Sequence, residues 1–167
     1  MRLLHRYRKG YFFGYGADQE EDMISAITGH KPKIIGKAVL HDYELRIQKL
    51  SEITTKGVNV QEMLRKNWGD SFKSYVIVAK KGAHVSGTLF KLSIIDRHLV
   101  DEWELVQLGW YKRIFVNVEL SETGKTFRAE TQLLNTDQHA KEIAKPGRRS
   151  WLMPKKMFLG IATRYRK

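Results

Sequence analysis

The stretch Tyr11-Phe12-Phe13-Gly14-Tyr15-Gly16-Ala17-Asp18 joins an aromatic run to a glycine and then to the start of an amphipathic segment. A short aromatic run is typical of a buried strand, and a glycine at its end allows a sharp turn. Asp18 precedes Glu21 by three residues, the spacing of a helix capping box, and the apolar residues that follow end at Gly29. The stretch therefore predicts a strand, a loop at Gly16–Asp18 and a helix, with outward amides at the helix start that suit an anion.

Alternation of apolar and polar residues predicts further strands over 38–48, Tyr111–Leu120 and Thr126–Leu134. Two more β-rich runs, Tyr75–Ala79 and Val85–Leu92, are separated by a short segment that contains a glycine. This pattern predicts a hairpin. We therefore expect an α+β fold, in which a mainly antiparallel sheet carries a few short helices.

Helical spacing of apolar residues occurs at two further places in the chain. The first ends at Trp68, in a segment 50–74 that we interpret as a helical insertion. The second covers Ile94–Glu104, for which Ser93 is a suitable cap. Its predicted buried stripe consists of residues four apart, Ile95, Leu99 and Trp103.

The 167 residues fit one domain, 1–167, that can bury a core without disulfides, and the absence of cysteine excludes thiolate chemistry. We expect the apolar residues of the basic C-terminal extension 136–167 to pack back onto the body. The histidines lie far apart in sequence, so we expect no metal site and no cofactor. Since no run of about 20 apolar residues occurs, we expect a soluble cytoplasmic protein without membrane partners.

Thirty Lys and Arg residues against eighteen Asp and Glu give a formal net charge of +12. Much of the excess lies in the N-terminal arm 1–10 and in the C-terminal extension. Such a charge attracts nucleic acid, anionic membranes or small anions, and it equally describes solvated termini that aid solubility.

An acidic cluster, Asp101-Glu102-Trp103-Glu104, lies at the end of the second predicted helix. A carboxyl group held beside apolar side chains has a raised pKa and can then carry a proton between substrate groups. An ordinary solvated helix end explains the same residues. Ideal helix geometry places Glu102 nearer the predicted stripe than Glu104, so periodicity alone does not choose between them.

The order of these motifs resembles the γ-glutamylcyclotransferase-like (AIG2-like) family. Members begin with a strand that ends in Tyr-Gly-(Ser/Thr), similar to Tyr15-Gly16-Ala17. They continue with a strand similar to Gly87-Thr88-Leu89-Phe90, a helix of the type Leu-Asp-x-x-Glu similar to Val100–Glu104, and a strand that opens with Tyr, as at Tyr111. The resemblance covers roughly residues 11–135 and implies a barrel-like, mainly antiparallel or mixed sheet.

The resemblance also implies an activity, the cleavage of a small γ-glutamyl amide by intramolecular cyclisation to 5-oxoproline. By the family's register Glu104 is the general acid and base, and its backbone loop, here Tyr15, Gly16, Ala17 and Asp18, holds the substrate. Tyr111 is expected to line the pocket. Three departures bear on this expectation: Ala17 replaces Ser or Thr, Asp18 stands where many members have Asn, and Leu105 replaces a glycine.

The alternative function is a non-catalytic module on the same fold that binds nucleic acid or a protein partner. Aromatic residues interleaved with cations can stack bases while pairing with phosphates. Three segments have this pattern: Arg6-Tyr7-Arg8, Trp110-Tyr111-Lys112-Arg113 and Arg164-Tyr165-Arg166.

Overall fold

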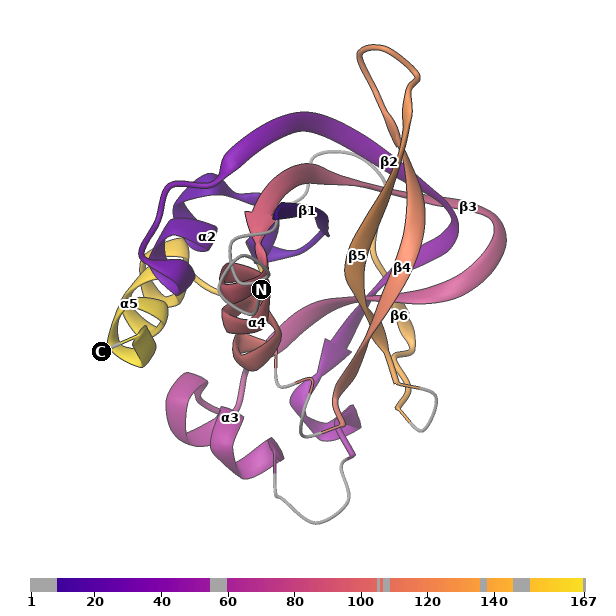
Figure 1. Cartoon of the computed structure of the whole chain (residues 1–167). Coiled ribbons are helices and arrows are strands. Elements are labelled where there is room, and N and C mark those ends of the chain that lie inside the picture. Colours follow the sequence, from indigo (N-terminus) through magenta and orange to yellow (C-terminus); the bar gives the residue numbers. More distant parts are fainter. Residues whose placement is uncertain are drawn as a thin grey trace.

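The computed structural model describes residues 9–54, 60–104, 106, 109–135, 138–145 and 151–166. Its strands form one sheet in the order β3-β1-β5-β4-β2-β6, and an additional pairing of β3 with β2 closes the first five into a barrel (Figure 1). All described pairings are antiparallel except the parallel pair of β1 and β5. The strands are β1 (Lys9–Gly14), β2 (Lys33–Lys49), β3 (Lys73–Ser93), β4 (Tyr111–Leu120), β5 (Thr126–Leu134) and β6 (Glu142–Ile143).

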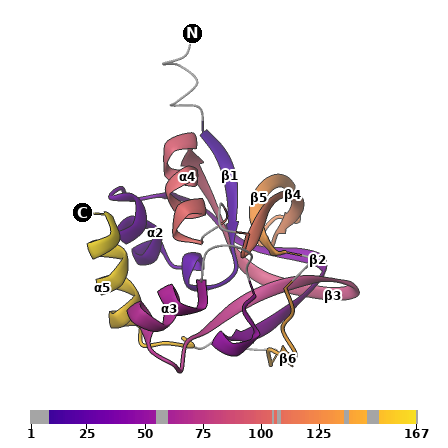
Figure 2. The ribbon, with the colours of Figure 1, turned by 90° about the horizontal axis from the view of Figure 1, so that it is seen from below.

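The helices gather on one side of the barrel, as Figure 2 shows. None of the helices in the described part of the chain has the length and apolar character needed to cross a membrane. The helices are α2 (Glu21–Thr28), α3 (Val60–Trp68), α4 (Ile94–Trp103) and α5 (Lys155–Arg166), with single 3-10 turns at Ala17–Gln19 and Leu50–Glu52.

Strand β1 separates two parts of the core because successive side chains of a strand point to opposite faces. Phe13 belongs to the cluster inside the barrel, together with Leu89 of β3. Phe12 belongs to the cluster between the barrel and the helices, where it meets Phe90 of β3 and Ala162 of α5. The burial of Ala162 confirms that the C-terminal extension packs back onto the body.

The hairpin expected between Tyr75–Ala79 and Val85–Leu92 is wrong, because both runs belong to the single strand β3. Both runs pair with β2, on either side of residues 80–83, and the register shifts between His41 and Tyr43. At this point Asp42 has φ +67° and accepts a hydrogen bond from the amide of Gly82, which has φ +86°. Gly82 thus lies at a bend in two paired strands. A glycine within a β-rich run is typical of a hairpin turn and of a β-bulge alike, so the sequence does not distinguish them.

The other predicted elements agree closely with the structure. Strands β4 and β5 have the predicted bounds, and α3 lies within the segment 50–74. The hydroxyl of Ser93 accepts a hydrogen bond from the Asp96 amide at 3.1 Å, so Ser93 caps α4 as predicted. Residues 1–8 of the basic arm lie outside the described residues, as do the N-terminal motif Arg6-Tyr7-Arg8 and the basic run 146–150.

Candidate active site

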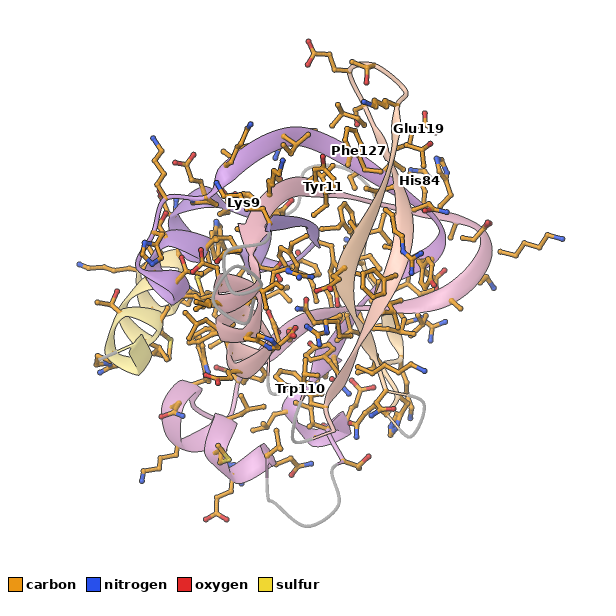
Figure 3. All side chains as sticks on the ribbon, viewed as in Figure 1. Lys9, Tyr11, His84, Trp110, Glu119 and Phe127 are labelled. Atoms are coloured by element: carbon orange, nitrogen blue, oxygen red, sulfur yellow. The ribbon has the colours of Figure 1, made fainter. Side chains whose placement is uncertain are left out.

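A pocket of about 160 Å³ opens where the loop after β1 meets the end of α4. This volume is close to the ~150 Å³ of an apolar cavity that holds benzene. The pocket includes Trp110, which lies at the other end of the barrel from the Tyr11 and Phe127 pair (Figure 3). Its lining comes from the loop (Tyr15, Gly16, Ala17, Asp18), from β3 (Lys73, Ser74, Tyr75), from the end of α4 (Glu102, Trp103, Glu104), from α3 (Met63, Leu64, Trp68) and from the C-terminal part (Trp151, Leu152, Phe158, Ile161).

Two glycines fix the path of the backbone into this loop. A Cβ atom at Gly14 would overlap the carbonyl oxygen of Asp18, and one at Gly87 would overlap the carbonyl oxygen of Gly14. Gly16, which we expected to provide the turn, has φ −103°, and a Cβ there would meet Tyr75 at an ordinary 3.7 Å. The close approach of β1, β3 and the loop therefore depends on Gly14 and Gly87.

Tyr15 anchors the loop to the far strand. Its side chain is buried, and its hydroxyl donates a hydrogen bond to the carbonyl oxygen of Gln132 at 2.6 Å. The aromatic ring thus packs inside the barrel, while the residue still borders the pocket. This contact holds the start of the loop against β5.

Asp18 does not cap α2 as we expected. The N-cap of α2 is Glu20, without a side-chain cap bond, and Asp18 lies in the preceding 3-10 turn. There its side chain accepts a hydrogen bond from the amide of Gly16 at 3.1 Å, and the residue is only 4% exposed. The capping spacing fails because the chain makes this turn before the α-helix begins, which directs the carboxyl group of Asp18 into the pocket.

Glu104 occupies the C-cap of α4, where its amide donates to the carbonyl oxygen of Val100 at 3.0 Å. The residue is partly exposed because it borders the pocket. Burial raises the pKa of Glu104 well above the ordinary 4.5, and the negative charges of Asp18 and Asp101 and a hydrogen bond to the Asp18 carboxyl group raise the pKa further.

The inner face of α4 differs from the predicted stripe. Ile95 is 44% exposed and Leu99 only half-buried, whereas Val100 and Asp101 are buried. Leu99 and Trp103 pack against the core as predicted, but the inner face also carries the charged Asp101, so apolar spacing marks this face only in part. Glu102 is exposed at the border of the pocket, and it is Glu104 that meets Asp18.

Tyr111, which we expected to line the pocket, is not among the residues that border it. It is 1% exposed, and its hydroxyl lies 3.2 Å from the hydroxyl of Ser74, which does border the pocket. Burial raises the pKa of Tyr111 well above 10.0, and the neighbouring Glu104 raises the pKa further. Its substrate-binding role stays a prediction.

Sequence reasoning treated the aromatic residues of α3 and of the C-terminal extension only as packing. Trp68, Trp151 and Phe158 all border the pocket. Their only signal in the sequence is their apolar character, which core residues share. Leu105 lies outside the described residues, and among the described ones no group of three His, Asp or Glu side chains could hold a metal ion.

Comparisons with known proteins bear on the fold. Residues 84–164 match the model of the AIG2-like family, so this part of the chain is similar to that family. None of the curated proteins matches the chain significantly.

Among solved structures, a γ-glutamyl cyclotransferase has the same fold, with a TM-score of 0.63 at 22% identity over 80% of this chain and 70% of the other. An uncharacterised protein from Homo sapiens gives a TM-score of 0.63 at 22% identity over 79% and 69%. An AIG2-like protein from Mus musculus gives 0.54 at 12% identity over 84% and 91%. The fold is thus that of γ-glutamylcyclotransferases.

Proposed function

We propose that this chain cleaves a γ-glutamyl amide by intramolecular cyclisation, with Glu104 as general acid and base. The observation that carries the proposal is the position of Glu104. It borders a pocket with its carboxyl group hydrogen-bonded to that of Asp18, and its pKa is raised. Perturbed carboxyl groups in a concave pocket are typical of catalytic acids and bases.

In this proposal the glutamyl half of the substrate lies against the loop from Tyr15 to Asp18. The small side chain of Ala17 leaves the backbone accessible at the pocket, although it supplies no hydroxyl group. The charge that Asp18 adds is partly offset, because its carboxyl group accepts a hydrogen bond from the Gly16 amide. The α-amine of the substrate would then face Glu104.

The reaction forms one bond and breaks one. The α-amine nitrogen attacks the γ-carbonyl carbon of its own glutamyl group, and the pair of Glu104 and Asp18 takes up the proton that this nitrogen loses. The bond from the carbonyl carbon to the amide nitrogen then breaks, and Glu104 returns a proton to the departing amine. The products are 5-oxoproline and a free amine, and because the ring closes within one molecule the reaction needs no other nucleophile.

The test is 5-oxoproline release from a panel of γ-glutamyl amides, with wild type beside Glu104→Gln and Glu102→Gln. We expect Glu104→Gln to lose at least about a hundredfold in kcat/KM, since general acid–base catalysis contributes about 10² to 10⁴. Glu102→Gln removes the same charge from an exposed position two residues away and should retain turnover. Loss in Glu102→Gln alone, or no release from any substrate, would contradict the proposal.

The alternative, a nucleic-acid module, has weaker support. Trp110 and Tyr111 are buried, so this aromatic pair has no face available for stacking bases. Residues 1–8 lie outside the described residues.

A further inference from the structure

One wall of the pocket is aromatic and comes from helices outside the barrel. Trp68 of α3 lies 4.6 Å from Phe158 of α5 and 6.0 Å from Trp103 of α4, between ring centroids. Phe158 in turn lies 5.3 Å from Trp151. The four rings, all of which border the pocket, therefore form one continuous surface, which we call the aromatic wall.

The aromatic wall is held in place by packing and by charge. Trp68 is 7% exposed, whereas Trp103, Trp151 and Phe158 keep part of their surface open. The ammonium group of Lys155 lies 5.8 Å from the centre of the Trp151 ring and pairs with Asp22 at 3.1 Å. Ordered aromatic rings with part of their surface exposed in a pocket bind apolar or aromatic groups at little cost in side-chain entropy.

The charged groups of the pocket disfavour a second anion. Among the described residues, four carboxyl groups border it, those of Asp18, Glu20, Glu102 and Glu104, against one cation, Lys73. This local excess of acid contrasts with the formal charge of +12 for the chain. A carboxylate on the amine half of a substrate would be repelled there, whereas an uncharged or cationic group would not.

We propose that the aromatic wall binds the amine half of the substrate and selects an aromatic or bulky apolar amine that carries no carboxylate. The inference rests on the proposed function for the glutamyl half, which occupies the loop and Glu104. The specificity-determining residues are Trp68, Trp151 and Phe158. They belong to α3 and to the C-terminal part, which lie outside the barrel.

A matched pair of substrates tests this selection. γ-Glutamyl phenethylamide and γ-glutamylphenylalanine carry the same ring and differ by one carboxylate. We expect kcat/KM for release of 5-oxoproline to be at least about tenfold higher for the phenethylamide. Equal values, or a preference for γ-glutamylphenylalanine, would overturn the inference while the proposed function stands.

A binding measurement separates the inference from catalysis. Calorimetric titration with phenethylamine should show binding to wild type, and Trp151→Ala should weaken it at least about tenfold. Phe115→Ala removes a 58% exposed ring elsewhere and should leave binding unchanged. Phe158 also packs against the core, so the variant at this position is Phe158→Leu, which keeps an apolar side chain. It should likewise weaken binding, and thermal unfolding checks that it still folds.

The outcomes are distinct. Phenethylamine binding that depends on Trp151 and Phe158, without release of 5-oxoproline from any amide, would retain the amine site and refute the proposed function. Absent binding, or binding that both variants leave unchanged, would overturn the amine site whatever the turnover.

Discussion

Carboxyl groups along α4 differ in the charges that surround them. Two of them form what we call the matched group: Glu130 of β5 pairs with Arg97, and Asp101 lies 3.1 Å from Arg113 and accepts a hydrogen bond from Gln132. At the end of α4, the charges that act on Glu104 are those of Asp18 and Asp101, both negative. Buried charges that support a fold are matched with opposite charges, whereas unmatched ones cost stability and are characteristic of catalytic sites. The difference places the proposed chemistry at one end of a single helix.

Breaking the matched group should have the largest effect on stability. Arg97→Met leaves the carboxyl group of Glu130, which is 7% exposed, with only Arg113 at 3.6 Å as a cation. We expect a loss of about 3 kcal/mol in the free energy of unfolding, since removal of the nearer partner leaves a buried charge only partly compensated. Urea denaturation measures the loss, and a change below about 1 kcal/mol would show that the pair is not buried as described.

Removing the negative charge beside Glu104 should act on catalysis in a defined direction. Asp18→Asn retains an oxygen for the Gly16 amide and replaces a negative neighbour of Glu104 with a neutral one. The pKa of Glu104 should fall, and the acidic limb of the kcat/KM profile should move to lower pH. Asp70→Asn, which removes an exposed carboxyl group, should leave the profile in place. If the acidic limb of the kcat/KM profile does not move in Asp18→Asn, Asp18 does not affect the pKa of Glu104.

The same pair, Glu104 and Asp18, should make stability depend on pH. In the native state the pKa of Glu104 lies above the ordinary 4.5 of an unfolded chain, so the native state holds more protons than the unfolded state as the pH rises from 4.5 toward the raised pKa. Wild type should therefore lose stability across this window relative to Glu104→Gln. Below 4.5 the difference between them should be constant. A difference that does not vary with pH, or that varies equally in Glu102→Gln, would contradict the account.

The smallest effect is expected at the most exposed member of the matched group. The side chain of Arg113 is 37% exposed, so water screens its attraction to Asp101. We expect Arg113→Gln to cost under about 1 kcal/mol in thermal or urea unfolding. The pKa of Asp101, which burial raises and Arg113 lowers, should rise in this variant. A loss as large as that of Arg97→Met would mean that both arginines are equally buried.

These contrasts explain what the sequence could predict. Strands β4 and β5 alternate cleanly because one face of each meets the core, so their bounds follow from the pattern. The bend of β3 at Gly82 was interpreted as a hairpin turn, because glycine occurs both in turns and in bends. Only the pairing with β2, which is distant in sequence, distinguishes the two. The order of family motifs compensated for this by indicating a barrel.

The prediction of the site was wrong where charged residues, and not apolar ones, face the barrel. The inner face of α4 carries Arg97 and Asp101, so a search for apolar periodicity selected Ile95, which is exposed. The carboxyl group of Asp18 reaches Glu104 because the chain turns before α2, a detail of loop geometry that residue spacing does not encode. Only the alignment with the family's Leu-Asp-x-x-Glu motif indicated Glu104.

The most direct test of the pair of Glu104 and Asp18 is a ¹³C NMR titration of the Glu104 side-chain carboxyl group in wild type and in Asp18→Asn, assigned with Glu104→Gln. The account predicts a midpoint above 4.5 in wild type that moves down in Asp18→Asn. A midpoint at or below 4.5 in wild type would contradict it.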